Sequence, residues 1–253
     1  MIRRKKLGEI ERISASCQIV FAVQQKIEAL VTPGVTPLEL DRIAEAEIRA
    51  LGAAPAFKGY HGFPYSICSS VNASIVHGFP DDTPLAVGDI ISIDVGAHLD
   101  GYYGDGAFTV GVGTIGPEAQ RLLDGTLACL EVGIAQARPD GRLSDISNAI
   151  ETHADAQGLA IIREYGGHGI GRKLHESPHI NNYGPPGKGP RLKPGHVFCI
   201  EPILCLGDPE VEHSDDGWTT VTRDRSLAAH SEHTVAITED GPQILTLPTA
   251  VQA

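Results

Sequence analysis

The sequence contains an internal repeat of about 106 residues, which limits the possible fold more than any other feature. One pair of predicted helices covers residues 5–30 and 38–51, and a second pair covers 117–137 and 144–157. The residues that match at this offset are Pro33 with Pro139, Leu40 with Ile146, Glu45 with Glu151, Ala50 with Ala156, and Gly52 with Gly158. Ordered matches of this kind predict a duplicated unit whose copies pack around a pseudo-two-fold axis.

The match continues beyond the helices. At an offset of 107, His61-Gly62 falls on His168-Gly169 and segment 88–94 falls on 195–201, while His77 matches His175 at 98. An extra loop around 181–190 supplies the nine residues of difference. We therefore predict an α/β (α+β) fold in which residues 1–253 form a single domain. Its two pseudo-symmetric helix–helix–strand halves cover about 5–115 and 116–250.

Composition and charge argue against several classes of protein. The formal net charge is −12 and the one basic run is Arg3–Lys6, so nucleic acid is not expected as the main ligand. No apolar run reaches 18 residues, and none follows the basic run as in a secretion signal, so no membrane association is expected. Five scattered cysteines form no paired framework, which favours the cytoplasm.

The segment Ser92–Phe108, SIDVGAHLDGYYGDGAF, is predicted to form a β-hairpin with its turn at His98–Gly101. A symmetric two- or four-residue loop sets Asp94 directly across from Asp105. Their Cβ atoms would then lie about 4.5–5.5 Å apart, where like charges destabilise a sheet. Two acids in this arrangement could share a proton, could be splayed apart on a solvated edge, or could bind a cation between them.

Further acids fall at corresponding places in the second half. The repeat puts Asp94 and Glu201 in equivalent positions, each ending an apolar strand. A last strand pair, Trp218–Thr222 and His233–Thr238, carries Glu232 at its start. The candidate metal ligands are Asp94, Asp105, His168, Glu201 and Glu232.

Four carboxylates carry a charge of −4, and burying them together without compensation would favour their protonation. Two divalent cations supply the opposite charge, so a cation is the best of the three explanations for the hairpin acids. Oxygen-rich sites with one imidazole suit Mn²⁺, Fe²⁺, Co²⁺ or Zn²⁺, and two-metal hydrolytic sites hold their ions about 3.5–4 Å apart.

These five residues stand in the order of the metal ligands of the type I methionine aminopeptidases, which the whole chain resembles. The resemblance implies the pita-bread fold around a dinuclear metal site. His175 and Glu201 are only 26 positions apart, which leaves no room for the type II insertion, and no zinc-binding extension precedes the first helix, so the short bacterial form is expected. The flanking segments that carry the resemblance are Tyr60–Pro64, Val76–Asp82, Ile93–Val95, Glu164–Arg172, Phe198–Pro202, Asp216–Trp218 and Ser231–Thr234.

The resemblance also implies a role for each residue. Asp105 and Glu232 bridge the metals, Asp94 holds one of them, and His168 and Glu201 hold the other. A metal-bridging hydroxide attacks the first peptide carbonyl, with Glu201 as a proton shuttle. The residues expected to contact substrate are His77 and His175, as hydrogen-bond donors, and Tyr60, Phe63, Cys68 and Trp218, as walls of the methionine pocket.

Some of these residues have structural alternatives. Cys68 and Trp218 could instead pack in the core. His61 matches His168 in the repeat yet is not a ligand in the family. At the pocket rim, Phe57 stands where a smaller residue or Cys is common, and Leu174 where an aromatic residue is common. The histidines interpreted as ordinary are His98, His153, His179, His196, His213 and His230.

The implied function is removal of the initiator methionine from nascent polypeptides with small second residues, in a single catalytic domain. Two alternatives remain: a prolidase- or Xaa-Pro-aminopeptidase-like hydrolase, and a non-catalytic binding module on the same scaffold. The expected cofactors are two divalent ions among Co, Mn, Fe and Zn. The expected partners are peptide substrates, with a transient ribosome contact, and the chain is expected to be a monomer.

Overall fold

The computed structural model describes residues 2–248 and confirms all four predicted helices. They are α1 (Leu7–Glu28), α2 (Pro37–Ala50), α3 (Pro117–Ala135) and α4 (Leu143–Ala156). The start of α2 illustrates why they form where predicted. The Thr36 hydroxyl accepts a hydrogen bond from the Glu39 amide, the Glu39 carboxylate accepts one from the Thr36 amide, and Pro37 occupies the first turn. No described helix is long and apolar enough to cross a membrane.

The first half builds a sheet around β4 (Ile90–Leu99), which pairs with β1 (Ala54–Pro55), β2 (Ile67–Val71) and β5 (Tyr102–Gly111), all antiparallel. The β4–β5 hairpin turns through Asp100 and Gly101, whose φ angles of 48° and 81° are both positive. This is the Asp-Gly arrangement of a two-residue hairpin loop, and it fixes the register of the whole hairpin.

The second half builds a five-stranded sheet in the order β15 (Gly241–Ile244), β14 (His233–Thr238), β9 (Val197–Ile200), β7 (Gly166–Gly169) and β8 (Glu176–Asn181). A smaller sheet joins β10 (Ile203–Cys205), β13 (Ala228–His230) and β6 (Ala160–Ile161).

The predicted last strand pair is wrong. β12 (Thr220–Thr222) pairs with β11 (Val211–His213) and with β3 (Ser74–Val76) of the first half, whereas β14 pairs with β9 and β15. Residues 206–227 leave the second half and cross to the first, which brings Trp218 toward the segments around His77. Sequence spacing alone does not reveal that this segment of the second half pairs with a strand of the first half.

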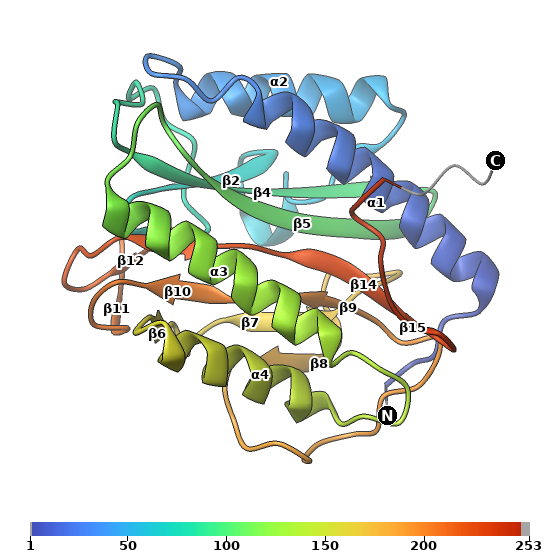
Figure 1. Cartoon of the computed structure of the whole chain (residues 1–253). Coiled ribbons are helices and arrows are strands. Elements are labelled where there is room, and N and C mark those ends of the chain that lie inside the picture. Colours follow the sequence, from blue (N-terminus) through green and yellow to red (C-terminus); the bar gives the residue numbers. More distant parts are fainter. Residues whose placement is uncertain (1, 249–253) are drawn as a thin grey trace.

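The helices lie on the outside and the strands form the interior layer (Figure 1). α1 and α2 cover the first-half sheet, and the core between them includes Ile27, Leu40, Ile91 and Ile93, all fully buried. α3 and α4 cover the second-half strands in the same way. Each half therefore buries its apolar strand faces against its own helix pair, as the repeat predicted.

Backbone pairing locates the pseudo-two-fold axis between β5 and the segment that leads into β14. The Glu232 amide donates to the Ala107 carbonyl at 2.8 Å, and the Ala107 amide donates to the Glu232 carbonyl at 3.4 Å. On either side of this pair, two threonines act in the same way. The Thr109 hydroxyl donates to the His230 carbonyl at 2.7 Å, and the Thr234 hydroxyl donates to the Asp105 carbonyl at 2.7 Å.

The register also corrects one match of the repeat. Ser70 pairs with Ser92 in the first half, and His168 pairs with Cys199 in the second. Since Ser92 and Cys199 are repeat equivalents, Ser70 and not His61 is the structural equivalent of His168. His61 lies in η1 (Tyr60–Gly62), a short 3₁₀ turn outside the strand pairing. The match of His61 with His168 in the sequence is therefore not a match in space.

Candidate metal centre

One cavity of about 630 Å³ lies between the two halves and contains every residue predicted to form the site. The predicted ligands at its wall are Asp94, Asp105, His168, Glu201 and Glu232. The predicted substrate contacts at its wall are His77, His175, Tyr60, Phe63, Cys68 and Trp218. The chain thus brings together eleven residues from widely separated segments.

The prediction that Asp94 and Asp105 lie directly opposite each other is wrong. Asp94 pairs with Ala107, and Asp105 pairs with Gly96, because the hairpin turns at Asp100-Gly101. The two acids are diagonal neighbours on the same face of the hairpin, which still lets both reach one ion. Asp94 also lies inside β4 instead of ending a strand, since β4 continues to Leu99.

The second half contains the opposed pair of acids instead. Ile200 pairs with His233, and Ile203 pairs with His230, so the same register runs through the gap between these pairs. Glu201 and Glu232 occupy this gap at facing positions. The sheet ladder is interrupted at both acids, and Glu232 turns its backbone to Ala107 of the first half.

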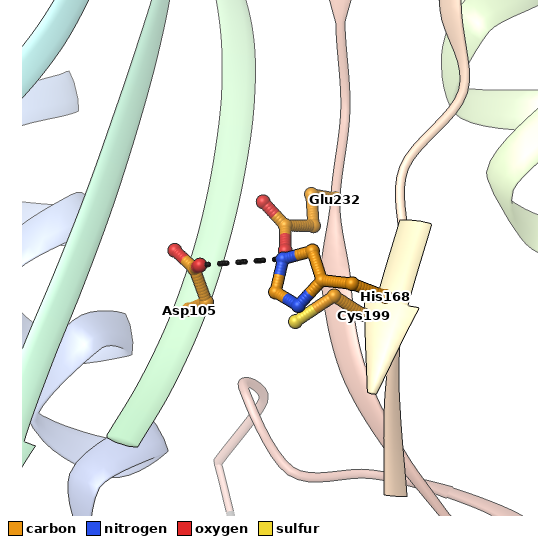
Figure 2. A group of neighbouring side chains, drawn as sticks. All are labelled: Asp105, His168, Cys199 and Glu232. Atoms are coloured by element: carbon orange, nitrogen blue, oxygen red, sulfur yellow. Dashed lines mark ion pairs between the residues drawn. The ribbon is translucent and has the colours of Figure 1, made fainter. Parts of the chain in front are cut away.

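His168 is held as a neutral imidazole with one nitrogen available. Its Nδ1–H donates to the Gly169 carbonyl at 3.0 Å, and burial lowers the pKa of the ring to about 3. The remaining nitrogen, Nε2, lies 3.7 Å from Asp105 Oδ2 (Figure 2). It also lies 3.6 Å from Glu201 Oε1. A neutral ring whose other nitrogen is fixed by a carbonyl is the usual state of a metal-binding histidine.

The four acids are in a setting that calls for positive charge. Burial raises the pKa of Asp94 to about 6. Burial, followed by the neighbouring carboxylates, raises the pKa of Asp105 and Glu232 well above the usual range, and burial does the same for Glu201. Asp94 Oδ1 and Glu232 Oε1 are buried without a hydrogen-bond partner among the described residues. These residues therefore fit divalent cations, which supply the missing charge and partners.

Two histidines flank the acids above the cavity floor. His175 Nδ1 lies 2.9 Å from the Tyr60 hydroxyl, and the His175 ring centroid is 4.3 Å from that of His168. His77 adopts a left-handed backbone conformation with φ of 58°, and its ring packs edge-on against Tyr165. Burial lowers the pKa of His77 to about 4 and also lowers that of His175, so both rings are neutral donors or acceptors at pH 7.

The far end of the cavity is an aromatic pocket. The Phe63 ring packs edge-on against Phe79 and Trp218, at centroid distances of 5.4 and 5.1 Å. Cys68 pairs with Asp94 in the sheet and is 6% exposed, so its thiol lies between the pocket and the acids. An apolar, thiol-containing pocket beside a charged floor suits an unbranched apolar side chain such as methionine.

Phe57 and Leu174, the two rim residues that differ from the common family residues, both fit into the cavity wall. Phe57 is buried against Gly96, where an added Cβ would lie 2.5 Å from the Phe57 ring. The missing side chain at Gly96 therefore makes room for the large ring. Leu174 is 1% exposed and also lines the cavity. His61, although not equivalent to His168, lines the cavity as well.

Sequence reasoning missed His230, which was interpreted as ordinary. It is 3% exposed, lines the cavity, and its Nε2 lies 3.4 Å from Glu201 Oε2. Ile203 pairs with His230 as Gly96 pairs with Asp105, so His230 is the second-half equivalent of Asp105. No match in the sequence repeat relates these two residues, because their equivalence appears only from the strand pairing. His179, which pairs with His168, also lines the cavity.

Comparisons with known proteins agree with this geometry. The model of metallopeptidase family M24 matches residues 11–239. Methionine aminopeptidase 1 of Bacillus subtilis is 48% identical over 246 residues, which cover 97% of this chain and 99% of that protein. Similarity therefore extends over nearly the full length of both chains, including every segment that contributes to the cavity.

Solved structures confirm the pita-bread fold. Methionine aminopeptidase from Rickettsia prowazekii superposes with a TM-score of 0.96 and 40% identity, covering 98% of this chain and 100% of that one. Prolidase from Pyrococcus furiosus superposes with a TM-score of 0.80 at 24% identity, and the match covers 66% of that chain. The second likeness shows the common fold alone.

Proposed function

The chain belongs to metallopeptidase family M24, and we propose that it removes N-terminal methionine from peptides whose second residue is small. The observation that carries this proposal is the cluster of four buried acids and a neutral histidine beneath an aromatic pocket. Relatives that match over nearly their whole length are methionine aminopeptidases, which supports this activity over that of a prolidase. A binding module without catalysis would have no need of four buried carboxylates.

For the ligands, we propose that Asp105 and Glu232 each contact both of two divalent ions. Asp105 on β5 and Glu232 just before β14 lie where the two halves meet, and each has acids of both halves nearby, which supports this assignment. Asp94 would complete one ion, and His168 with Glu201 would complete the other. When bound, the ions supply a water of lowered pKa and polarise the scissile carbonyl.

The remaining steps belong to side chains of this chain. Glu201 would take a proton at a carboxylate oxygen and return it to the leaving amine. In the tautomer in which the Tyr60 hydroxyl donates to His175 Nδ1, 2.9 Å away, Nε2–H is left as a donor to the oxyanion that develops on the scissile carbonyl. His77 offers a second donor to the peptide, and Phe63 with Trp218 holds the methionine side chain.

The experiment that tests this function compares three peptides. The Mn²⁺-loaded protein should release methionine from Met-Ala-Ser at a kcat/KM at least about a hundredfold above that for Met-Lys-Ser, because a closed site rejects a long second residue. It should release nothing measurable from Ala-Pro-Ser. Preferential cleavage of Ala-Pro-Ser would instead identify a prolidase-like specificity, and no cleavage of any peptide would favour the binding module.

The His175→Ala variant tests the assignment of a donor. Because a donor to the oxyanion acts in the transition state, kcat should fall at least about a hundredfold while bound metal per chain stays near the parent value. Metal content by mass spectrometry and steady-state kinetics are the measurements, with His98→Ala, which does not line the cavity, as the control. Loss of metal in His175→Ala would make His175 a ligand instead.

We also propose a transient contact with the ribosome, through phosphate groups of its RNA. Support comes from the end of the molecule where the N-terminal segment meets two loops (Figure 1). Arg4 Nε donates to the Pro194 carbonyl, and Arg142 forms a backbone bridge with Arg191. Nine of the 20 Lys and Arg residues belong to these segments: Arg3, Arg4, Lys5, Lys6, Arg138, Arg142, Lys188, Arg191 and Lys193.

Among the described residues, Arg191 and Lys193 of this basic end form no ion pair. Arg191 Nη1 donates to the Asp140 carbonyl at 3.3 Å, which leaves its charge, like that of Lys193, without a counter-ion to compete with phosphates. Sedimentation with ribosomes should weaken as salt is raised and should be lost in Arg191→Glu/Lys193→Glu. Lys26→Glu, on α1 away from these loops, is the control. Equal sedimentation of the two variants would contradict the contact.

Three further proposals concern the state of the chain. Its five cysteines are free and buried, which supports a reducing compartment such as the cytoplasm, and cell fractionation tests this location. The exposed large apolar residues come from separate elements, which supports a monomer, to be checked by analytical ultracentrifugation. Residues 1–253 would form one catalytic domain, so thermal unfolding should be a single transition.

A further inference from the structure

Cys199 lies directly beneath the acids, at a position that the proposed ligand set leaves unused. It sits on β9, is fully buried, and pairs with His168 on one side and Thr234 on the other. Its Sγ and one ligand atom each of Asp105, His168 and Glu232 all lie within 4.8 Å of one another (Figure 2). Four donors of metal-binding type at this mutual distance can close around a single ion with small side-chain adjustments.

The pseudo-two-fold axis supplies an internal comparison for Cys199. Its equivalent in the first half is Ser92, whose Oγ lies 2.7 Å from the Thr109 hydroxyl. Cys199 Sγ lies 3.5 Å from the hydroxyl of Thr234, the matching threonine. A hydroxyl therefore satisfies the structural role of this position in the first half. The second half, which also holds His168, carries a thiol in its place.

A second observation points to a ligand at this place. Glu232 is 2% exposed, and its Oε1 has no hydrogen-bond partner among the described residues. A buried carboxylate oxygen without a partner is costly unless a cation or donor reaches it. The thiol and this carboxylate therefore belong to one buried cluster of potential ligands in which an oxygen of Glu232 still lacks a partner.

We propose that Cys199 is a sulfur ligand for the ion held by His168, and that it gives this centre a preference for thiophilic divalent ions such as Zn²⁺, Co²⁺ and Cd²⁺. The inference rests on the ligand set proposed above. The Sγ–H bond breaks, the proton leaves to solvent, and a coordinate bond forms from sulfur to the ion. Soft thiolate ligands select such ions over Mn²⁺, which prefers carboxylate oxygens.

Two ligand arrangements are then available to the same ion. Glu201 Oε1 lies 3.6 Å from His168 Nε2, so a hard ion can take the carboxylate. A thiophilic ion can sit deeper and take Cys199 in addition or instead. The identity of the ion would thus change the charge and the freedom of Glu201, the residue proposed to move the proton.

The test uses the full chain loaded with Co²⁺ alone. The parent should show a near-ultraviolet sulfur-to-cobalt charge-transfer band, and Cys199→Ser should lose it while keeping the hydroxyl that Ser92 provides in the first half. Measured by competition titration, the affinity for Cd²⁺ should be at least about tenfold weaker in Cys199→Ser than in the parent, and the affinity for Mn²⁺ should be less than about twofold weaker. The control is Cys17→Ser, another fully buried thiol close to Thr234, which should keep the band.

Several outcomes would overturn the proposal. A parent that binds Co²⁺ without the band would remove Cys199 from the ligands while leaving the proposed function intact. A parent that binds no divalent ion would overturn the ligand set and this inference together. If a folded Cys199→Ser variant lost affinity for Cd²⁺ and Mn²⁺ equally, Cys199 would not be a ligand, and its role would be limited to the contact with Thr234. If that variant fails to fold, Cys68→Ser, which removes the other thiol beside the acids, decides the matter: the band should persist in it, and loss of the band would assign the sulfur to Cys68.

Discussion

Removal of divalent ions should reduce methionine release from Met-Ala-Ser by at least about a thousandfold. The expected loss is large because no side chain lining the cavity is an activated nucleophile. Burial raises the pKa of the Cys68 thiol well above its usual range, and it lowers the pKa of His168 to about 3 and that of His77 to about 4. The chain itself therefore supplies proton transfer and positioning, and the activation of water depends on the ions.

The measurement is kcat/KM after dialysis against a chelator, with residual metal determined by mass spectrometry. Re-addition of Mn²⁺, Co²⁺ or Fe²⁺ should restore activity, whereas Mg²⁺ should restore little, since it retains its waters and does not favour imidazole. Full activity in a sample shown to contain no transition metal would refute the proposed chemistry.

Much of the fold could be predicted because the duplication is written in the spacing of the sequence. The four helices begin and end within a few residues of their expected bounds, since capping residues and apolar spacing are local signals. Pairing between distant strands is not local. Nothing near Trp218 in the sequence indicates that β12 leaves its own half to pair with Ser74–Val76 of β3.

The site shows the same division between local and distant information. All five acid and imidazole candidates meet in the cavity, because carboxylates that end or interrupt apolar strands are conspicuous. The predicted register of Asp94 and Asp105 is wrong by two residues, because the hairpin loop is centred on Asp100-Gly101 and not on the midpoint between the two acids. His230 was missed because its equivalence to Asp105 appears only once β10 and β13 are paired.

The Thr109 and Thr234 hydroxyls could not have been found from sequence at all. Each donates to the backbone of a residue more than a hundred positions away, across the axis between the halves. They fix the backbone of His230 and Asp105 without entering the cavity. The two halves therefore hold each other's site residues in place, which ties the geometry of the centre to the packing of the duplicated unit.

A Glu232→Gln substitution should change thermal stability in opposite directions with and without metal. In the metal-free protein, the folded-state pKa of Glu232 is raised well above its usual value, mainly by burial. The folded state then binds more protons than the unfolded state, so this group stabilises least at high pH, and stability falls as pH rises above about 4.5. Glutamine has no such penalty, so metal-free Glu232→Gln should melt at least about 2 °C above the parent at pH 8.

With saturating Mn²⁺ the order should reverse. Loss of the charged oxygen proposed to contact both ions should weaken metal binding at least about a hundredfold, which would remove about 2.7 kcal/mol of ligand-linked stability and lower Tm by about 5–10 °C. Scanning calorimetry from pH 5 to 8 provides the measurement. The pH dependence of stability due to buried histidines such as His168 cancels between parent and variant, because both contain them.

Glu131→Gln, at an exposed position on α3, is the control and should change neither melting temperature. If Glu232→Gln instead melted below the parent in both states, the carboxylate would be stabilising the fold on its own, and its position among the proposed ligands would need another explanation.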